Sequence, residues 1–313
     1  MAYPANEPEL PQPLPDGLYD KLAAQYGHED LARIVEGYRT VRPVTLRANT
    51  LKADHASIAA QLQEAHIEWQ PAPSPLDSEA FVICQAREDA IRALSAYEAG
   101  ELYLQSLSAM LPAHALKPRA GENVLDMAAA PGGKTCHMAA LSQGAALITA
   151  CEKNHVRAER LRYNLAKQGA SRVNVMECDA RKLDSFFSFD KVLLDAPCSG
   201  SGTVRYADGS FKTGFSLELL SRSVKTQQAL LRKALDIVNP GGFVLYATCS
   251  ILAEENEELI RRVLPKARAE LVPLPDGLLE GVPLLPCQLP EAAVVCPSEY
   301  FEGFFLALIK KGR

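Results

Sequence analysis

Two cysteines stand directly after apolar runs that are typical of strands. Cys198 lies in LLDAPCSGSGTVR (residues 193–205) and Cys249 lies in YATCS (residues 246–250). A free cysteine is most often a small buried hydrophobe. Here the flanking proline, serine and glycine residues indicate turns rather than core, which weakens that interpretation. A thiolate at such a position is a potential nucleophile.

A second chemical motif is the segment VLDMAAAPGGKT, residues 124–135. An apolar strand runs into a turn of small residues and then into a helix, so a ligand can approach the backbone and the helix N-terminus offers free amides to an anion. A P-loop is excluded, because that motif needs glycine five positions before Gly133 and the chain has Ala128 there. A purely structural glycine turn stays open as the alternative.

Two acidic residues then end successive strands, Glu152 and Asp179. Open α/β sheets bind ligands at the carboxyl ends of their strands. Glu152 is placed to accept hydrogen bonds from ribose hydroxyls, and Asp179 from an adenine amino group. Each alone could be a solvated strand end or a helix cap, but both behind a glycine turn favour a nucleoside-type cofactor.

The elements that must position these residues alternate between strand and helix after about residue 100, which is typical of an open, mainly parallel sheet with helices on both faces. The expected strands are residues 123–127, 146–152, 173–179, 191–196, 243–248 and 304–309. The expected helices are residues 134–141, 156–168, 217–238 and 254–263. This part, residues 101–313, is predicted to be one domain.

The region before residue 101 has a different pattern. Residues 1–18, rich in proline and acids, predict a flexible lead-in. Residues 19–100 predict a smaller domain, with helical periodicity over residues 18–38 interrupted near Gly27, and strands at 43–51 and 80–84. Asp54 is expected to cap a helix, because its carboxylate can accept from the free amides of the first turn.

The composition of the chain restricts the kinds of molecule and environment that it can be expected to bind. The formal net charge of −5 excludes a protein covered in positive charge, so any nucleic-acid binding needs a local basic face. The chain has no run of about 18 apolar residues and no signal-like start, which predicts a cytoplasmic protein without a membrane span. The eight cysteines include no CxxC pair, so reduced thiols are expected rather than disulfides or a metal site.

Taken in order, six pieces resemble the NOL1/NOP2/Sun family of RNA cytosine-5 methyltransferases. They are LRANTLK (46–52), GELYLQ (100–105), APGGKT (130–135), DAPCSGSGT (195–203), YATCS followed by EEN (246–256), and the terminal EGFFLALIKK. The resemblance runs from about residue 40 to the end. It implies a Rossmann-like class I methyltransferase sheet whose last strand is antiparallel, with a smaller α+β N-terminal RNA-binding domain.

The resemblance also implies a reaction, the transfer of a methyl group from S-adenosylmethionine to carbon 5 of a cytosine in RNA. Ribosomal RNA is the expected substrate, with transfer RNA as the alternative. The residues expected at the cofactor are Ala128, Ala129, Ala130, Pro131, Gly132, Gly133, Lys134, Glu152, Arg157, Asp179 and Asp195. Competing interpretations are a DNA or protein methyltransferase of the same fold and a non-catalytic RNA-binding assembly factor.

The family assigns different tasks to the two cysteines. The cysteine matching Cys249 attacks carbon 6 of the base, and the one matching Cys198 assists product release. Asp195 is expected at ring N3, with Lys134 orienting the base. DNA cytosine methylases instead attack with the cysteine of the Pro-Cys motif, so the roles could be exchanged.

Expected RNA contacts are Arg42, Arg47 and Lys52 in the N-terminal region. Arg157, Arg160 and Arg162 are further candidates, although a solvated charged face explains them equally well. Near the chain end, Gln288 and Glu291 stand where relatives often have basic groups. Neither the target nucleotide nor the oligomeric state follows from the sequence.

Overall fold

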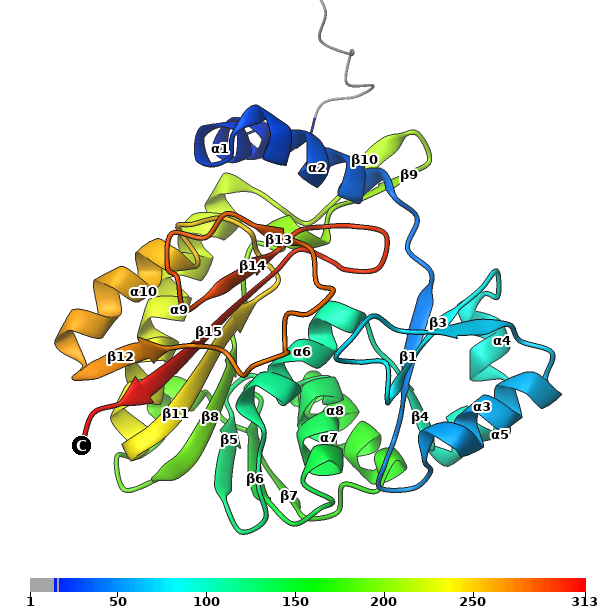
Figure 1. Ribbon diagram of the computed structural model, residues 1–313. Coiled ribbons are helices and arrows are strands. Elements are labelled where there is room, and N and C mark those ends of the chain that lie inside the picture. Colours follow the sequence, from blue (N-terminus) through cyan, green and yellow to red (C-terminus); the bar gives the residue numbers. More distant parts are fainter. Residues whose placement is uncertain (1–13, 16) are drawn as a thin grey trace, which may run out of the picture.

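The computed structural model describes residues 14, 15 and 17–313 (Figure 1). The predicted lead-in therefore lies mostly outside the described residues. Within its described part, the side chains of Leu14 and Leu18 are buried in the main core, so the lead-in ends earlier than expected. No helix among the described residues is both long enough and apolar enough to cross a membrane.

The larger sheet has the strand order β13-β14-β15-β11-β8-β5-β6-β7. Its parallel strands are β5 (Asn123–Asp126), β6 (Leu147–Cys151), β7 (Val173–Met176), β8 (Phe189–Asp195) and β11 (Val238–Thr248). The last strand, β15 (Phe304–Lys311), pairs antiparallel with β11, which confirms the predicted sheet. Three short antiparallel strands were not predicted: β12 (Ala269–Val272), β13 (Leu284–Leu285) and β14 (Ala293–Val295).

Helices cover both faces of this sheet. One face carries α6 (Leu107–Leu116), α7 (Gly133–Leu141) and α8 (His155–Gln168), and the other carries α9 (Leu217–Ile237) and α10 (Glu257–Val263). Strand β8 serves both cores, because Leu193 faces one side while Val192 and Leu194 face the other. Helix α6 was missed in the sequence since it is apolar all round and shows no amphipathic period.

A second, four-stranded antiparallel sheet has the order β2-β3-β1-β4. Its strands are β2 (Trp69–Pro71), β3 (Ala80–Ile83), β1 (Val44–Ala48) and β4 (Leu102–Leu104), and its helices are α3 (His55–Glu64), α4 (Glu88–Arg92) and α5 (Ser95–Ala99). The Asp54 carboxylate accepts a 2.8 Å hydrogen bond from the Ser57 amide, as expected of the cap of α3. Strand β4 lies beyond the boundary predicted at residue 100, so this sheet extends to residue 104.

Helices α1 (Leu18–Gln25) and α2 (His28–Arg39) lie over the larger sheet, above the carboxyl ends of its strands (Figure 1). The hydroxyl of Tyr26 donates to the carbonyl of Ile251 at 2.6 Å, and that of Tyr38 to the carbonyl of Ser201 at 2.5 Å. The region predicted as one N-terminal domain is therefore divided: its first helices brace loops of the larger sheet, and the rest forms the small sheet.

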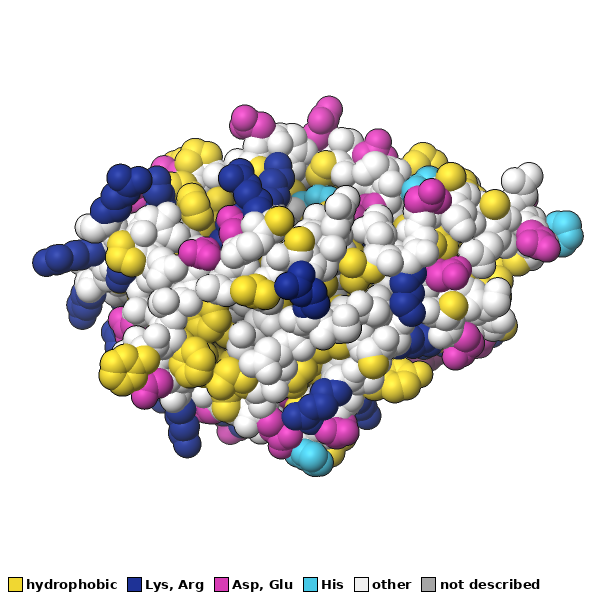
Figure 2. Space-filling model, turned by 90° about the horizontal axis from the view of Figure 1, so that it is seen from below, with side chains coloured by type: hydrophobic (Ala, Val, Ile, Leu, Met, Phe, Trp, Pro, Cys, Tyr) yellow, Lys and Arg dark blue, Asp and Glu magenta, His cyan; other side chains and the backbone are white. Residues whose placement is uncertain are grey.

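Several short elements follow the strands at the carboxyl-terminal edge of the larger sheet. They are the single turns η1 (Ala180–Lys182) and η2 (Ser201–Thr203), and the hairpin of β9 (Arg205–Ala207) and β10 (Ser210–Lys212). A third turn, η3 (Leu264–Lys266), follows α10. The lower face of the molecule, turned away from this edge, shows basic, acidic and apolar side chains mixed together (Figure 2). A polyanion would therefore find no single basic face there.

Candidate active site

Two thiols meet at the carboxyl ends of β8 and β11. These strands are parallel neighbours with Asp195 opposite Ala247, so the loops that follow them leave the sheet side by side. The sulfur atoms of Cys198 and Cys249 lie 2.9 Å apart, and both residues are half-buried. The hydrogen bond to Cys249, together with burial, raises the pKa of Cys198 well above its ordinary value. Cys198 is therefore held as a thiol that can donate toward Cys249.

The segment EEN fixes both cysteine loops. The buried Glu255 accepts hydrogen bonds from the amide of Ser199 at 2.8 Å and from its hydroxyl at 2.5 Å. Asn256 accepts from the Thr248 hydroxyl at 2.7 Å and donates to the Ser250 carbonyl at 2.9 Å. In the sequence, EEN was noted only as part of the family resemblance. Its place directly after the strand and loop that carry Cys249 was the signal that it could hold the cysteine loops.

Lys134, at the start of α7, donates a 2.7 Å hydrogen bond to Asp195, at the end of β8. Burial alone would lower the pKa of Lys134, but the charge and hydrogen bond of Asp195, with a smaller effect of Cys249, raise it above the ordinary value. The ammonium group also lies 5.5 Å from the centre of the Phe304 ring. The structure thus brings a fixed cation and its carboxylate to the edge that carries the thiols.

A cavity of about 200 Å³ opens beside this pair. Its lining consists of Tyr103, Leu104, Gln105, Ala109, Asp126, Ala128, Ala129, Ala130, Pro131, Gly133, Lys134 and Asp195. Gly132 has φ +112, a conformation that side chains rarely adopt, and it precedes α7 without a side-chain cap on that helix. The free amides of α7 suit a carboxylate, so this end of the cavity is suited to an anionic group of a ligand.

Asp126 is a cavity residue that the sequence analysis did not single out. Its side chain is buried, and its carboxylate accepts a 2.7 Å hydrogen bond from the Thr135 hydroxyl. Burial raises the pKa of Asp126 to about 6. Asp126 is the last residue of β5, whereas Glu152 directly follows β6 and Asp179 lies three residues beyond the end of β7. Its position at the end of an apolar strand was the available signal.

Glu152 and Arg157 lie behind the cavity loop. The buried Glu152 carboxylate accepts from the Asn154 amide at 2.8 Å and lies 3.5 Å from the Arg157 guanidinium. Arg157 also donates to the Ala130 carbonyl at 2.8 Å, so it ties the acid to the loop. Among the described residues, Gly132, Glu152, Arg157 and Asp179 were expected at the cofactor but do not line this cavity.

Asp179 adopts the alternative that the sequence left open, a helix cap. Its carboxylate caps η1 and pairs with the Arg181 guanidinium. The hydrogen bond from Arg181 lowers the pKa of Asp179 to about 2. A ligand that used this carboxylate would share it with Arg181.

Arg47, which the sequence predicts to contact RNA, lies in the interior of the protein. Its side chain is fully buried, and its Nε donates to Gln105 at 2.9 Å. Burial lowers the pKa of Arg47 below its ordinary value. A second, longer hydrogen bond of 3.4 Å reaches the Gly133 carbonyl, so Arg47 joins the small sheet to the glycine turn rather than facing solvent.

The other expected RNA contacts reach the surface. Lys52 is exposed, although its ammonium donates to the carbonyls of Ala99 and Lys167, each at 2.7 Å. Arg42 is half-buried and donates to the carbonyls of Gly37 and Phe301, each at 3.0 Å. On α8, Arg160 and Arg162 lie on the outer side, where Arg162 pairs with Glu159 and Glu177.

Comparison with known proteins agrees with this geometry. Residues 113–310 match the family described as 16S rRNA methyltransferase RsmB/F, and residues 14–88 match the ferredoxin-like domain of RsmF/B-like methyltransferases. The chain is 34% identical over 311 residues to the 25S rRNA (cytosine-C(5))-methyltransferase nop2 of Schizosaccharomyces pombe, covering 94% of this chain and 50% of that protein. It spans 32% to 50% of the length of the eukaryotic relatives that it matches.

Two solved structures from Pyrococcus horikoshii share the fold. A methyltransferase homolog protein has a TM-score of 0.78 and 30% identity, and the match covers 95% of this chain and all of that one. NSun6 with SFG has a TM-score of 0.82 over 96% of this chain and 98% of that one; at 21% identity it supports the fold alone. With a family model matching over most of its length and its motif residues gathered at one sheet edge, the chain belongs to the 16S rRNA methyltransferase RsmB/F family.

Proposed function

We propose that this chain transfers a methyl group from S-adenosylmethionine to carbon 5 of a cytosine in ribosomal RNA. The observation that carries the proposal is the pair of thiols 2.9 Å apart, next to the Lys134–Asp195 pair. A methyltransferase that acts on nitrogen or oxygen needs no thiol pair at this edge. The RNA class rests on relatives whose names specify cytosine-C5 methylation of ribosomal RNA.

The cofactor assignment rests on the 200 Å³ cavity and on the acids behind it. S-adenosylmethionine would supply an electrophilic methyl group there. The loop from Ala128 to Lys134 would hold its amino-acid end, and Glu152 its ribose.

Carbon 5 of cytosine is a weak nucleophile, which explains the need for a thiolate. We assign Cys249 to the addition at carbon 6, which turns the ring into an enamine-like species whose carbon 5 can accept a methyl group. Negative charge then develops toward ring N3. The Lys134 ammonium, held by Asp195, is the donor that stabilises this charge.

Release of the methylated RNA requires the reverse of the thiolate addition to carbon 6. Loss of the carbon 5 proton to solvent restores the ring double bond and breaks the bond between carbon 6 and sulfur, so the electron pair returns to Cys249. Cys198, held as a thiol within hydrogen-bonding distance, stabilises the departing thiolate. The 2.9 Å distance between the two sulfur atoms thus supports a role for Cys198 in release.

The direct test is to incubate the protein with radiolabelled S-adenosylmethionine and unmodified total RNA, then digest the RNA and identify the labelled nucleoside. The expected product is 5-methylcytidine, absent when Cys249→Ala protein is used. Parallel reactions with DNA and bulk protein test the other methyltransferase interpretations. Cofactor binding without label in RNA would contradict the proposal and favour a non-catalytic assembly factor.

A further inference from the structure

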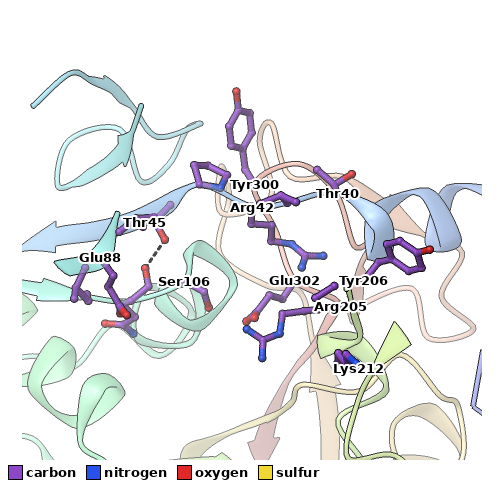
Figure 3. Close-up of a pocket in the computed structure, with 16 residues that line it drawn as sticks. Thr40, Arg42, Thr45, Glu88, Ser106, Arg205, Tyr206, Lys212, Tyr300 and Glu302 are labelled. Atoms are coloured by element: carbon purple, nitrogen blue, oxygen red, sulfur yellow. Dashed lines mark hydrogen bonds between the residues drawn. The ribbon is translucent and has the colours of Figure 1, made fainter. Parts of the chain in front are cut away.

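A second cavity of about 610 Å³ lies between the small sheet and the larger one (Figure 3). Residues from five separate segments meet there: the connection between α2 and β1 with the start of β1, the first residue of α4, the end of β4 with the two residues after it, the β9–β10 hairpin, and the loop before β15. The cavity shares Leu104 and Gln105 with the smaller cavity beside Lys134. The two cavities are therefore adjacent.

The hairpin brings two cations directly opposite each other in this cavity. Arg205 on β9 pairs in register with Lys212 on β10. Both are exposed, and within residues 14, 15 and 17–313 neither side chain forms a hydrogen bond or an ion pair. Like charges directly opposite on paired strands destabilise the pairing. This repulsion is relieved when an anion binds between them.

A third cation adds to the positive charge. Arg42 lines the cavity. Burial is the main cause that lowers the pKa of Arg42, and the positive charge of the nearby Arg205 lowers it further. Figure 3 shows Arg42 and Arg205 on either side of Glu302. Glu302 and Glu88 are the two carboxylates in the lining, so three cations face two acids and the balance is positive.

Aromatic side chains stand beside these cations. Tyr206 packs edge-on against Phe211 across the hairpin, with ring centres 5.1 Å apart, and it lines the cavity. Tyr300 lines it from the C-terminal loop, and its hydroxyl accepts from Gln70 at 3.0 Å. Single-stranded nucleic acid is bound by this combination, in which cations hold phosphates and rings stack on bases.

The hairpin is coupled to the thiols by a tight contact. Gly202, between Cys198 and β9, donates its amide to the Cys249 carbonyl at 3.0 Å and accepts from the Gly303 amide at 2.9 Å. A Cβ on Gly202 would lie only 2.1 Å from the Gly303 carbonyl oxygen, so the backbones leave no room for a side chain. The turn η2, which leads into the hairpin, is therefore anchored beside Cys249.

We propose that the β9–β10 hairpin is a phosphate clamp for the single-stranded RNA substrate. Arg205 and Lys212 bind backbone phosphates next to the target nucleotide, and Tyr206 stacks on a neighbouring base. The inference rests on the proposed function and adds the element that positions the RNA. The clamp acts on binding and placement, and the thiols carry the chemistry.

The test compares the wild type with the double variant Arg205→Ala/Lys212→Ala. RNA affinity is measured by fluorescence anisotropy of a labelled single-stranded RNA oligonucleotide at several salt concentrations. The slope of log K against log[salt] is expected to become shallower by about 0.7 for each phosphate that the variant no longer neutralises, about 1.4 for the two. S-adenosylmethionine affinity, measured by calorimetry, stays unchanged, and the KM for RNA rises more than kcat falls.

A charge-matched control is Arg222→Ala/Lys225→Ala, which removes two exposed cations from α9. It should keep the wild-type slope. The thermal stability of the hairpin variant should be equal to or above that of the wild type, because the repulsion between the two cations is removed. The single variant Arg205→Lys, which keeps the positive charge, should retain most of the wild-type RNA affinity. Unchanged affinity and slope in the hairpin variant, or an equally large drop in affinity in the α9 control, would overturn the clamp.

The two proposals fail separately. If the wild type binds RNA through the hairpin but produces no 5-methylcytidine, the clamp stands and the proposed reaction falls. If 5-methylcytidine forms equally well with and without the two cations at limiting RNA, the reaction stands and the clamp falls.

Discussion

The sulfur atoms of Cys198 and Cys249 lie 2.9 Å apart, although 51 positions separate the two residues in the chain. Parallel pairing of β8 with β11 brings them to one edge. Their loops are held by a hydrogen bond that Glu255 accepts from the Ser199 amide and one that Asn256 donates to the Ser250 carbonyl. The two thiols are therefore close enough to share a hydrogen bond, and the roles that we propose for them differ.

These roles predict different outcomes for the two alanine variants. Cys249→Ala should abolish methyl transfer because it removes the thiolate that we assign to the addition at carbon 6. Cys198→Ala should transfer the methyl group but release the RNA slowly, so that a covalent protein–RNA adduct accumulates and is visible after denaturing electrophoresis. Cys84→Ala, at a half-buried cysteine of the small sheet, is the control and should behave as the wild type. Activity in the Cys249→Ala protein would refute the assignment.

The Lys134–Asp195 pair predicts a loss in the rate of the chemical step. Lys134→Met should lower the rate of methyl transfer by about 10²–10³-fold, the usual effect of removing one donor from a developing anion. Single-turnover kinetics at saturating RNA and cofactor measure this rate, and calorimetry measures cofactor affinity separately. Lys134→Arg should recover part of the rate. A Lys134→Met enzyme with an unchanged single-turnover rate would rule out the donor role.

The burial of Arg47 predicts that its substitution lowers the free energy of unfolding rather than the affinity for RNA. Arg47→Ala removes a buried hydrogen bond from a charged donor, and such bonds contribute about 1.5–3 kcal/mol to the free energy of unfolding. Urea denaturation measures the loss, and Arg160→Ala, at an exposed position, should stay within about 0.5 kcal/mol of the wild type. A variant of wild-type stability with a shallower salt dependence of RNA binding would restore Arg47 as a phosphate contact.

A buried cluster at the junction of the two sheets predicts a pH dependence of stability. The Nε2 atoms of His114 and His137 lie 2.7 and 2.9 Å from the same oxygen of Glu79. Burial, with the nearby Arg47, lowers the pKa of His137 from 6.5 to about 4. Burial alone would raise the pKa of Glu79, but its contacts with the two imidazoles lower it below the ordinary value.

The sign follows from the protons bound by each state. Between pH 6.5 and about 4 the unfolded chain binds a proton at residue 137 and the folded chain does not, so the free energy of unfolding falls as pH falls, by up to about 1.4 kcal/mol per pH unit. Urea denaturation across this range should show a smaller slope for His137→Gln than for the wild type. The exposed His28→Gln serves as the control. Equal slopes in wild type and His137→Gln would show that His137 does not titrate in this range.

The sequence by itself determined the larger sheet and the composition of its active edge. Alternating strands and helices predict parallel pairing, and parallel strands present their carboxyl ends at one edge, so residues that follow successive strands must lie near one another. Cys198, Cys249, Asp195 and Lys134 could be grouped for that reason. The cap at Asp54 was also predictable, because a capping interaction involves only residues three positions apart.

Only the tertiary structure decided features that depend on partners distant in sequence. Arg47 has the sequence pattern of a surface cation, and its burial follows from Gln105 and the glycine turn meeting it across two sheets. Helix α6 lacks a periodic pattern because neighbours surround it. The cation pair of Arg205 and Lys212 exists because a hairpin register sets them opposite each other, and seven positions along the chain do not specify that register. A local sequence pattern indicates only which face of one helix or strand is apolar. The burial of a charged side chain and its pairing with another charge depend on the elements that pack against that helix or strand.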